Sequence, residues 1–132
     1  MIDEGQLPAW IALFFGIYAL AAGIGELRKP GFWTSMVGDF GQNSALRFLT
    51  GIVVLALGAI IYLANPWRPD DWLAVVVTVI GGWMIVEGAL ILAAGDLFLG
   101  FAARLMGSAS RLWAILSILI GLGIGAVGLL RL

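Results

Sequence analysis

The chain has 132 residues, of which 62% are hydrophobic and only 11% are charged, and its formal net charge is −1. A soluble domain normally carries about a quarter of its residues as Asp, Glu, Lys or Arg, and a chain this short cannot hide so much apolar surface from water. The composition therefore predicts a protein embedded in lipid. The small net charge excludes the basic surface that binding to nucleic acid requires.

The sequence contains neither cysteine nor histidine. Without cysteine, disulfides, thiolate catalysis and thiolate metal sites are excluded. Without histidine, zinc and haem sites and general acid–base catalysis near neutral pH lose their usual side chain. We therefore expect no metal site, no cofactor and no enzymatic activity.

Four stretches of the chain are long and apolar enough to span a membrane. A helix needs about 20 residues to cross about 30 Å of hydrocarbon, and an open sheet could not satisfy its backbone there. The four stretches run from Pro8 to Glu26, from Ala45 to Ala64, from Trp72 to Gly95 and from Leu112 to Leu130. They predict an all-α integral membrane protein with four transmembrane helices.

The connections between these spans differ in character. The middle one, residues 65–71, is predicted to be a tight turn. The first and third repeat their large apolar residues at helical spacing, which predicts two short amphipathic helices in the membrane interface. These residues are Phe32, Trp33, Met36, Val37 and Phe40 in the first connection, and Phe98, Phe101, Ala102, Leu105 and Met106 in the third.

The basic residues are distributed unequally between the two ends of the predicted spans. Arg68 and Arg131 belong to one end. The other five, in or beside the first and third connections, are Arg28, Lys29, Arg47, Arg104 and Arg111. By the positive-inside rule, these two connections face the cytoplasm and both termini face the outer side.

The two halves of the chain resemble each other at a shift of about 65 residues. Gly16 and Gly23 correspond to Gly81 and Gly88, and Trp33 corresponds to Phe98. After a slip of one residue, the stretch 44–47 (SALR) corresponds to 108–111 (SASR). We therefore predict a single membrane domain with an internal repeat, 8–64 and 72–131. Each copy would be a hairpin of two spans joined by an interfacial helix, and both copies would insert in the same orientation.

This unit resembles the small hairpin proteins of the YjeT-like family of bacterial inner-membrane proteins. The features that carry the resemblance read Ala22-Gly23, Pro30, Trp33 and Arg47 in the first copy. In the second copy they read Glu87-Gly88, Gly95, Phe98 and Arg111. The resemblance implies a multi-pass protein of the bacterial cytoplasmic membrane built from hairpin units, and it implies no activity.

Glu87 is the most unusual residue of the predicted spans. At 1.5 Å per residue, it lies about 22 Å along its helix from Trp72, inside the hydrocarbon core. Ionisable residues at this depth are costly and are functional candidates. Glu87 could be a proton- or cation-responsive site, or it could be a structural group that is neutral, hydrogen-bonded or paired with Arg47, Arg104 or Arg111. The few other polar residues of the spans, such as Thr50, Thr78 and Ser117, do not form an evident transport pathway.

Glu26 and the glycines have simpler interpretations. Glu26 stands at the end of the first span beside Arg28 and Lys29 and is expected to be a solvated boundary charge. Small residues let helix backbones approach closely in lipid, either within one chain or between subunits. The candidate helix-packing positions are Gly16, Gly23, Gly81, Gly88, Gly121 and Gly125.

The function expected from the sequence is that of a structural or accessory subunit. It would pack against a larger inner-membrane complex through its glycine faces and interfacial aromatic residues. The alternative is a small channel or carrier that works as a homo-oligomer, with Glu87 lining the path. A weaker alternative is a lipid-binding or membrane-organising protein that uses the basic interfacial helices.

Overall fold

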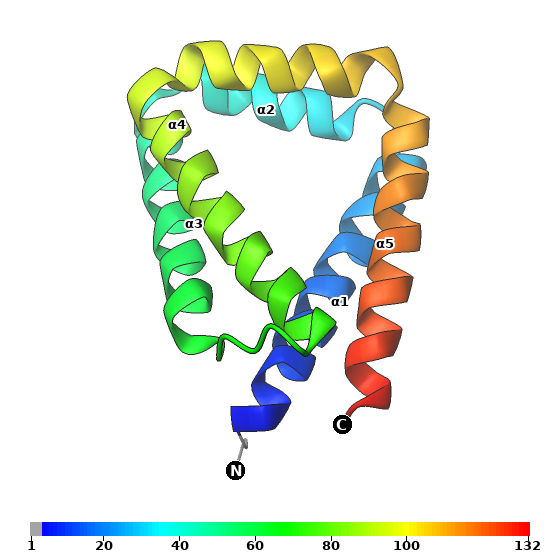
Figure 1. Cartoon of the computed structure of the whole chain (residues 1–132). Helices are drawn as coiled ribbons and strands as arrows, with labels where there is room; N and C mark the ends of the chain where they lie inside the picture. Colours follow the sequence, from blue (N-terminus) through cyan, green and yellow to red (C-terminus); the bar gives the residue numbers. More distant parts are fainter. Residues whose placement is uncertain (1–3) are drawn as a thin grey trace.

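The computed structural model describes residues 4–132, and almost all of them are helical (Figure 1). A single turn, η1 (Glu4–Gln6), precedes α1 (Leu7–Arg28). The remaining helices are α2 (Phe32–Gln42), α3 (Ser44–Ala64), α4 (Trp72–Ser108) and α5 (Ser110–Leu130). Of these, α1, α3, α4 and α5 are long and apolar enough to cross a membrane. The chain is therefore a multi-pass membrane protein.

The helix starts follow from local chemistry. Pro8 occupies the first turn of α1, where its missing N–H costs nothing. The Asn43 side chain accepts a 3.1 Å hydrogen bond from the Leu46 N–H and so caps α3. The Asp71 carboxylate does the same for Leu73 at the start of α4, also at 3.1 Å. Such caps satisfy backbone donors that have no partner within the helix.

The fourth helix is broken within its length. Ala94 has φ −145° and ψ 50°, outside the helical region. The third predicted span ends one residue later, at Gly95, and the chain continues as helix up to Ser108. Figure 1 shows that this second part of α4 and α2 both lie across one end of the long helices, whereas the two termini lie at the other end. We call α2 and residues 95–108 the crossing helices; that they lie in a membrane interface stays a prediction.

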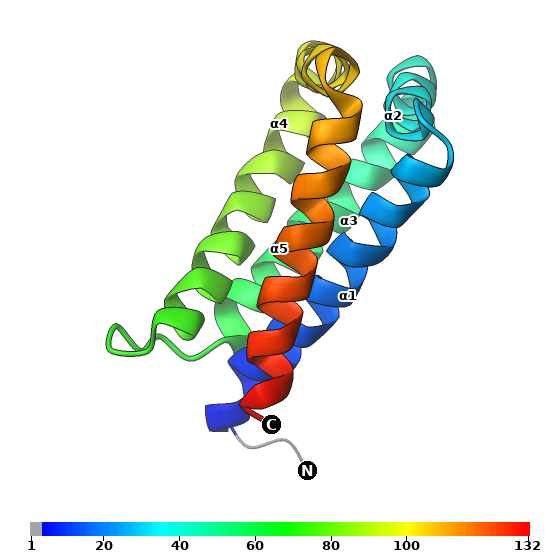
Figure 2. The same cartoon turned by 90° about the vertical axis from the view of Figure 1, so that its right-hand side faces the viewer.

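The long helices form two pairs, but not the pairs expected from the repeat. Helix α1 packs along α5, and α3 packs along the first part of α4 (Figure 2). The expected hairpin of the first and second spans is not confirmed, and neither is that of the third and fourth. Each pair instead combines one helix from residues 8–64 with one from residues 72–131. The repeat itself stays a prediction.

Glycines bring α1 and α5 into backbone contact. A β-carbon on Gly16 would lie 2.5 Å from the Cα of Gly125, and one on Gly121 would lie 2.5 Å from the backbone nitrogen of Leu20. The Ser117 hydroxyl donates a 2.7 Å hydrogen bond to the carbonyl of Ala19 across the same contact. Close approach and an interhelical hydrogen bond are the two interactions that hold helices together in lipid.

The pair of α3 and α4 is built in the same way. A β-carbon on Gly88 would lie 2.6 Å from the backbone nitrogen of Leu55, and one on Gly58 would lie 2.8 Å from the carbonyl oxygen of Gly81. At the turn between the helices, the buried Asn65 amide donates to the carbonyl of Ala74 at 2.9 Å. The two pairs therefore rest on equivalent glycine contacts.

The pairs are joined to each other near the termini. Ala12 of α1 packs with Leu73 and Val77 of α4 in a small buried cluster. Beside it, Arg131 donates a 2.7 Å hydrogen bond to Asp71, and its guanidinium lies 5.5 Å from the ring centre of Trp72. At the opposite end, α2 leads from the first pair to the second and packs against α4. The pairs are thus connected at both ends.

Candidate functional site: a cleft between the helix pairs

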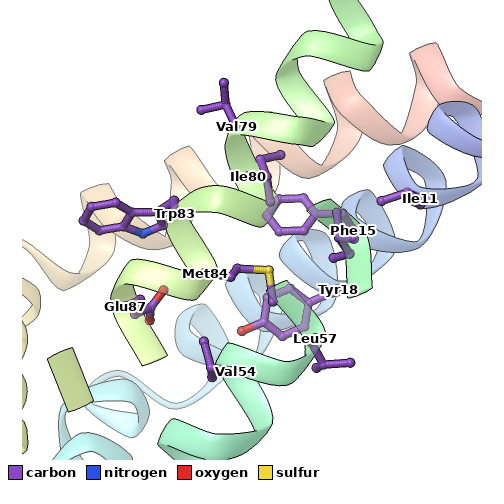
Figure 3. A pocket seen from close by; sticks show the side chains of 11 residues that line it. Ile11, Phe15, Tyr18, Val54, Leu57, Val79, Ile80, Trp83, Met84 and Glu87 are labelled. Atoms are coloured by element: carbon purple, nitrogen blue, oxygen red, sulfur yellow. The ribbon is translucent and has the colours of Figure 1, made fainter. Parts of the chain in front are cut away.

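An apolar cleft of about 750 Å³ lies between α1, α3 and α4. Helix α1 contributes Phe15 and Tyr18 to its lining, and α3 contributes aliphatic side chains such as Val54. Helix α4 contributes Trp83 and Glu87 (Figure 3). Tyr18 and Trp83 are 68% and 57% exposed, so the cleft is widely open at the surface of the protein.

Glu87 is the only carboxylate in the lining of this cleft. Its side chain is half-buried, and within residues 4–132 no hydrogen bond or ion pair reaches it. In Figure 3 the Glu87 carboxylate and the Tyr18 hydroxyl both lie within the cleft, among apolar side chains. The sequence singled out Glu87 for its depth. The structure adds that it faces a cavity.

The three arginines considered as ion-pair partners do not pair with Glu87. Arg47 lies across Gly95 and donates a 3.2 Å hydrogen bond to the carbonyl of Gly41. Arg111 lines a separate cavity of about 410 Å³, and Arg104 is exposed on a crossing helix. All three stand at the end of the molecule that carries the crossing helices. Glu87 lies seven residues before the break at Ala94, about 10 Å deeper along the helix, which places it out of their reach.

Glu26 is not the solvated boundary charge that the sequence suggested. It is only 1% exposed. Its carboxylate accepts hydrogen bonds from the backbone N–H of Gly31 at 2.8 Å and of Trp33 at 3.4 Å. Trp33 in turn donates from its indole nitrogen to the carbonyl of Ala22 at 3.1 Å. Glu26 therefore accepts hydrogen bonds from backbone N–H groups at the start of α2 that have no partner within the helix. The helix dipole also favours negative charge at this end.

This role could not be read from neighbouring charges along the sequence. The turn at Gly31, which has φ +91°, folds α2 back so that its first N–H groups meet the end of α1. A carboxylate five to seven residues before a predicted helix start is a weak signal for such a cap. The nearby Arg28 and Lys29 favoured the simpler interpretation of Glu26 as a solvated boundary charge, which is wrong.

The six candidate helix-packing glycines all lie at contacts within the chain. Gly16 and Gly23 face α5, and Gly121 and Gly125 face α1. Gly81 and Gly88 face α3. The contact at Gly125 is looser than the others, because a β-carbon there would lie no closer than 3.6 Å to its nearest neighbour. These faces are occupied by the chain's own helices and are not open for docking.

A second apolar cavity, of about 390 Å³, lies on the other side of Phe15 and Tyr18, which line both cavities. Trp33 and Trp113 form part of its wall. Each of these indoles donates to a backbone carbonyl, Trp113 to that of Leu105 at 2.9 Å. Their N–H groups are therefore engaged in the fold.

Over residues 4–132, no group of three His, Cys, Asp or Glu side chains is close enough to hold a metal ion. Comparisons of the chain with protein-family models, with curated proteins and with solved structures find no match. The geometry of the cleft is therefore the observation from which a function has to be inferred.

Proposed function

We propose that this chain is a small membrane protein of the carrier type, which takes an amphiphilic solute from the bilayer into the cleft beside Glu87. The observation that carries the proposal is a half-buried carboxylate without a partner in a cavity of about 750 Å³. Sites for small ligands commonly measure about 300–1,000 Å³, with mostly apolar walls and a few polar groups. Ionisable residues in spans usually face such cavities and mark the path of a substrate or ion.

The packing of the glycines favours this function over that of an accessory subunit. The sequence argument for a subunit relied on glycine faces that could dock against other proteins. Gly16 and Gly121 approach opposing backbone instead, and so do Gly81 and Gly88. These glycine faces are already packed inside the chain. The cleft, in contrast, contains a carboxyl group without a hydrogen-bond or ion-pair partner in the described part of the chain.

The proposal is tested by photolabelling the protein in lipid nanodiscs with a small hydrophobic diazirine and mapping the labelled peptides by mass spectrometry. We expect labels on Phe15, Tyr18 and Met84, and we expect an unlabelled amphiphile in excess to remove them. Phe48 and Leu119 are exposed residues outside the lining, so their labelling reports plain contact with lipid. Cleft labels that resist competition as fully as these two would contradict the proposal.

A variant that fills the cleft provides a second readout. Leu57 lines the cleft and Leu49 does not, although both are exposed residues of α3. We expect Leu57→Trp to suppress the competed labels, because the larger side chain occupies the cavity. Leu49→Trp, which places the same side chain on the same helix against lipid, should leave them unchanged.

The accessory-subunit function is kept as a second candidate because of one observation on α3. Along its 21 residues, this helix buries only Gly51 and Gly58, so a broad apolar face remains for lipid or for a partner. Mild detergent extraction from native membranes, followed by native mass spectrometry, separates the two. A discrete complex with other polypeptides would support the accessory subunit, and a monomer or homo-oligomer would support the carrier.

A further inference from the structure

We propose that the solute taken by the cleft is a hydrophobic monovalent cation, held between the Glu87 carboxylate and the aromatic rings of Phe15, Tyr18 and Trp83. This inference rests on the proposed function and specifies its ligand. Its chemical class is an organic ammonium or phosphonium ion with apolar substituents. It would enter from the bilayer through the open side of the cleft.

The charge of the lining selects a cation. Among the residues that line the cleft, Glu87 is the only carboxylic acid, and no basic side chain accompanies it. An anionic amphiphile would be repelled, and a neutral one would leave the carboxylate unpaired in an apolar surrounding, which is costly. A cation supplies the partner that Arg47, Arg104 and Arg111 do not.

The aromatic residues select a cation that is itself apolar. The faces of Trp, Tyr and Phe rings attract positive charge, and the attraction grows where water is excluded. Three such rings come from two different helices, and the thioether of Met84 belongs to the same lining. The aliphatic side chains of α3 complete a wall suited to alkyl or aryl substituents.

The same lining argues against an inorganic cation as the resident ligand. Calcium takes six to eight oxygen ligands, and magnesium requires nearly ideal octahedral geometry. The cleft offers one carboxylate and one phenol. A large organic ion loses little hydration on entering, so a single carboxylate with aromatic contacts is sufficient.

Protons should compete with the cation at this site. The titratable groups that face the cleft from α1 and α4 are Tyr18 and Glu87, and α3 contributes none. Of these two groups, Glu87 is the carboxylic acid, so it is the group that acid protonates. Protonation of Glu87 removes the negative charge that pairs with the cation, and binding should therefore weaken as the pH falls.

The test compares two ligands of the same shape and different charge. Full-length protein in phosphatidylcholine nanodiscs is titrated with tritiated methyltriphenylphosphonium and, separately, with triphenylethane, which replaces the phosphorus by carbon and is neutral. Binding to empty nanodiscs is subtracted. We expect saturable binding of the cation, tighter than that of the neutral compound by about tenfold or more, as an ion pair with aromatic contacts provides.

Glu87→Gln should abolish this preference. The affinity for the cation should fall about tenfold, and the affinity for the neutral compound should stay unchanged. Asp96→Asn is the matched control, because Asp96 is an exposed carboxylate on the same helix outside the cleft. A pH titration of the unsubstituted protein gives the same answer without a variant. The cation should lose affinity in acid, and the neutral compound should not.

The outcomes separate the inference from the function on which it rests. If both compounds bind equally well, the choice of a cation is wrong while a binding cleft remains. If the cation keeps its advantage in Glu87→Gln, the pairing of the cation with Glu87 is wrong, and the inference fails in that form. If neither compound binds more than it does to empty nanodiscs, the proposed function fails together with the inference.

Discussion

Gly16 and Gly125 face each other across the contact of α1 and α5, but the two positions tolerate additional volume differently. A β-carbon on Gly16 would lie 2.5 Å from the Cα of Gly125, closer than real contacts allow. A β-carbon on Gly125 would lie 3.6 Å from the Cα of Gly16, an ordinary contact distance. Local geometry therefore decides which glycines hold the helix pair together. Their presence on one face of a helix does not.

This asymmetry predicts a graded response to alanine. Gly16→Ala and Gly121→Ala should destabilise the protein by about 1–3 kcal/mol, because the added methyl group meets opposing backbone that cannot move aside. Gly125→Ala should be nearly neutral. Gly123→Ala, on the same helix with open space around it, is the control. Unfolding in mixed detergent measures the order, and an equal loss in all four variants would contradict it.

Glu26 predicts a second stability effect, at the start of α2. Glu26→Ala leaves the part-buried N–H groups of Gly31 and Trp33 without their charged acceptor, at a cost of about 1–3 kcal/mol. Glu26→Gln keeps one carbonyl oxygen and should lose less. Hydrogen exchange at the amides of residues 31 and 33 reports the cap directly. Asp39→Ala, at an exposed carboxylate of α2, should leave these amides protected.

The contact of Asp71 with Arg131 predicts a dependence of stability on acid. The hydrogen bond from Arg131 is the main cause that holds the pKa of Asp71 below its ordinary value of 3.8. A carboxylate with a lowered pKa in the folded state stabilises the protein above its ordinary pKa, and the contribution is lost as the pH falls through the folded value. The loss should therefore occur below about pH 4.

The size of this effect should be small, because both side chains are partly exposed. Exposed ion pairs contribute about 0–1 kcal/mol. Asp71→Asn should remove the acid-dependent part of the stability, and Arg131→Gln should raise the pH at which it is lost. A stability profile that is identical in the three proteins between pH 2 and pH 6 would show that the contact has no energetic role.

The orientation of the chain can be tested because it has no cysteine. Single cysteines are introduced at Ser35 in α2 and at Arg68 in the turn between α3 and α4. The positive-inside rule predicts that an impermeant thiol reagent added outside intact cells reaches position 68 and not position 35. The reverse pattern would place the termini in the cytoplasm.

Much of the fold could be predicted from the sequence. The limits of the spans depend on the length of each apolar stretch and on the Pro, Asn and Asp residues that begin or end the helices. The pairing of the spans could not. Small residues recur every seven positions on the buried side of all four long helices, so each helix could pair with several others. They are Ala9, Gly16 and Gly23 on α1; Gly51 and Gly58 on α3; Ala74, Gly81, Gly88 and Gly95 on α4; and Ala114, Gly121 and Gly128 on α5.

The candidate site was predictable in part. The depth of Glu87 follows from counting residues along a span, and this alone identified it as a candidate. Its neighbours Phe15 and Tyr18 belong to α1, more than sixty residues away, and nothing in the sequence brings them to α4. The cleft arises because α1 pairs with α5 and α3 with α4, and it could not be foreseen from the expected hairpins.

The most direct measurement on the cleft is the reaction of Glu87 with an apolar carbodiimide in nanodiscs, followed by peptide mass spectrometry. Carbodiimides modify protonated carboxyls, and an apolar one reaches them through lipid. If Glu87 faces an open cleft without a partner, it should be modified, and methyltriphenylphosphonium should slow the reaction. Glu26, buried and hydrogen-bonded, should stay unmodified in the same sample. An unreactive Glu87, or one that the cation does not protect, would contradict a ligand site at this carboxylate.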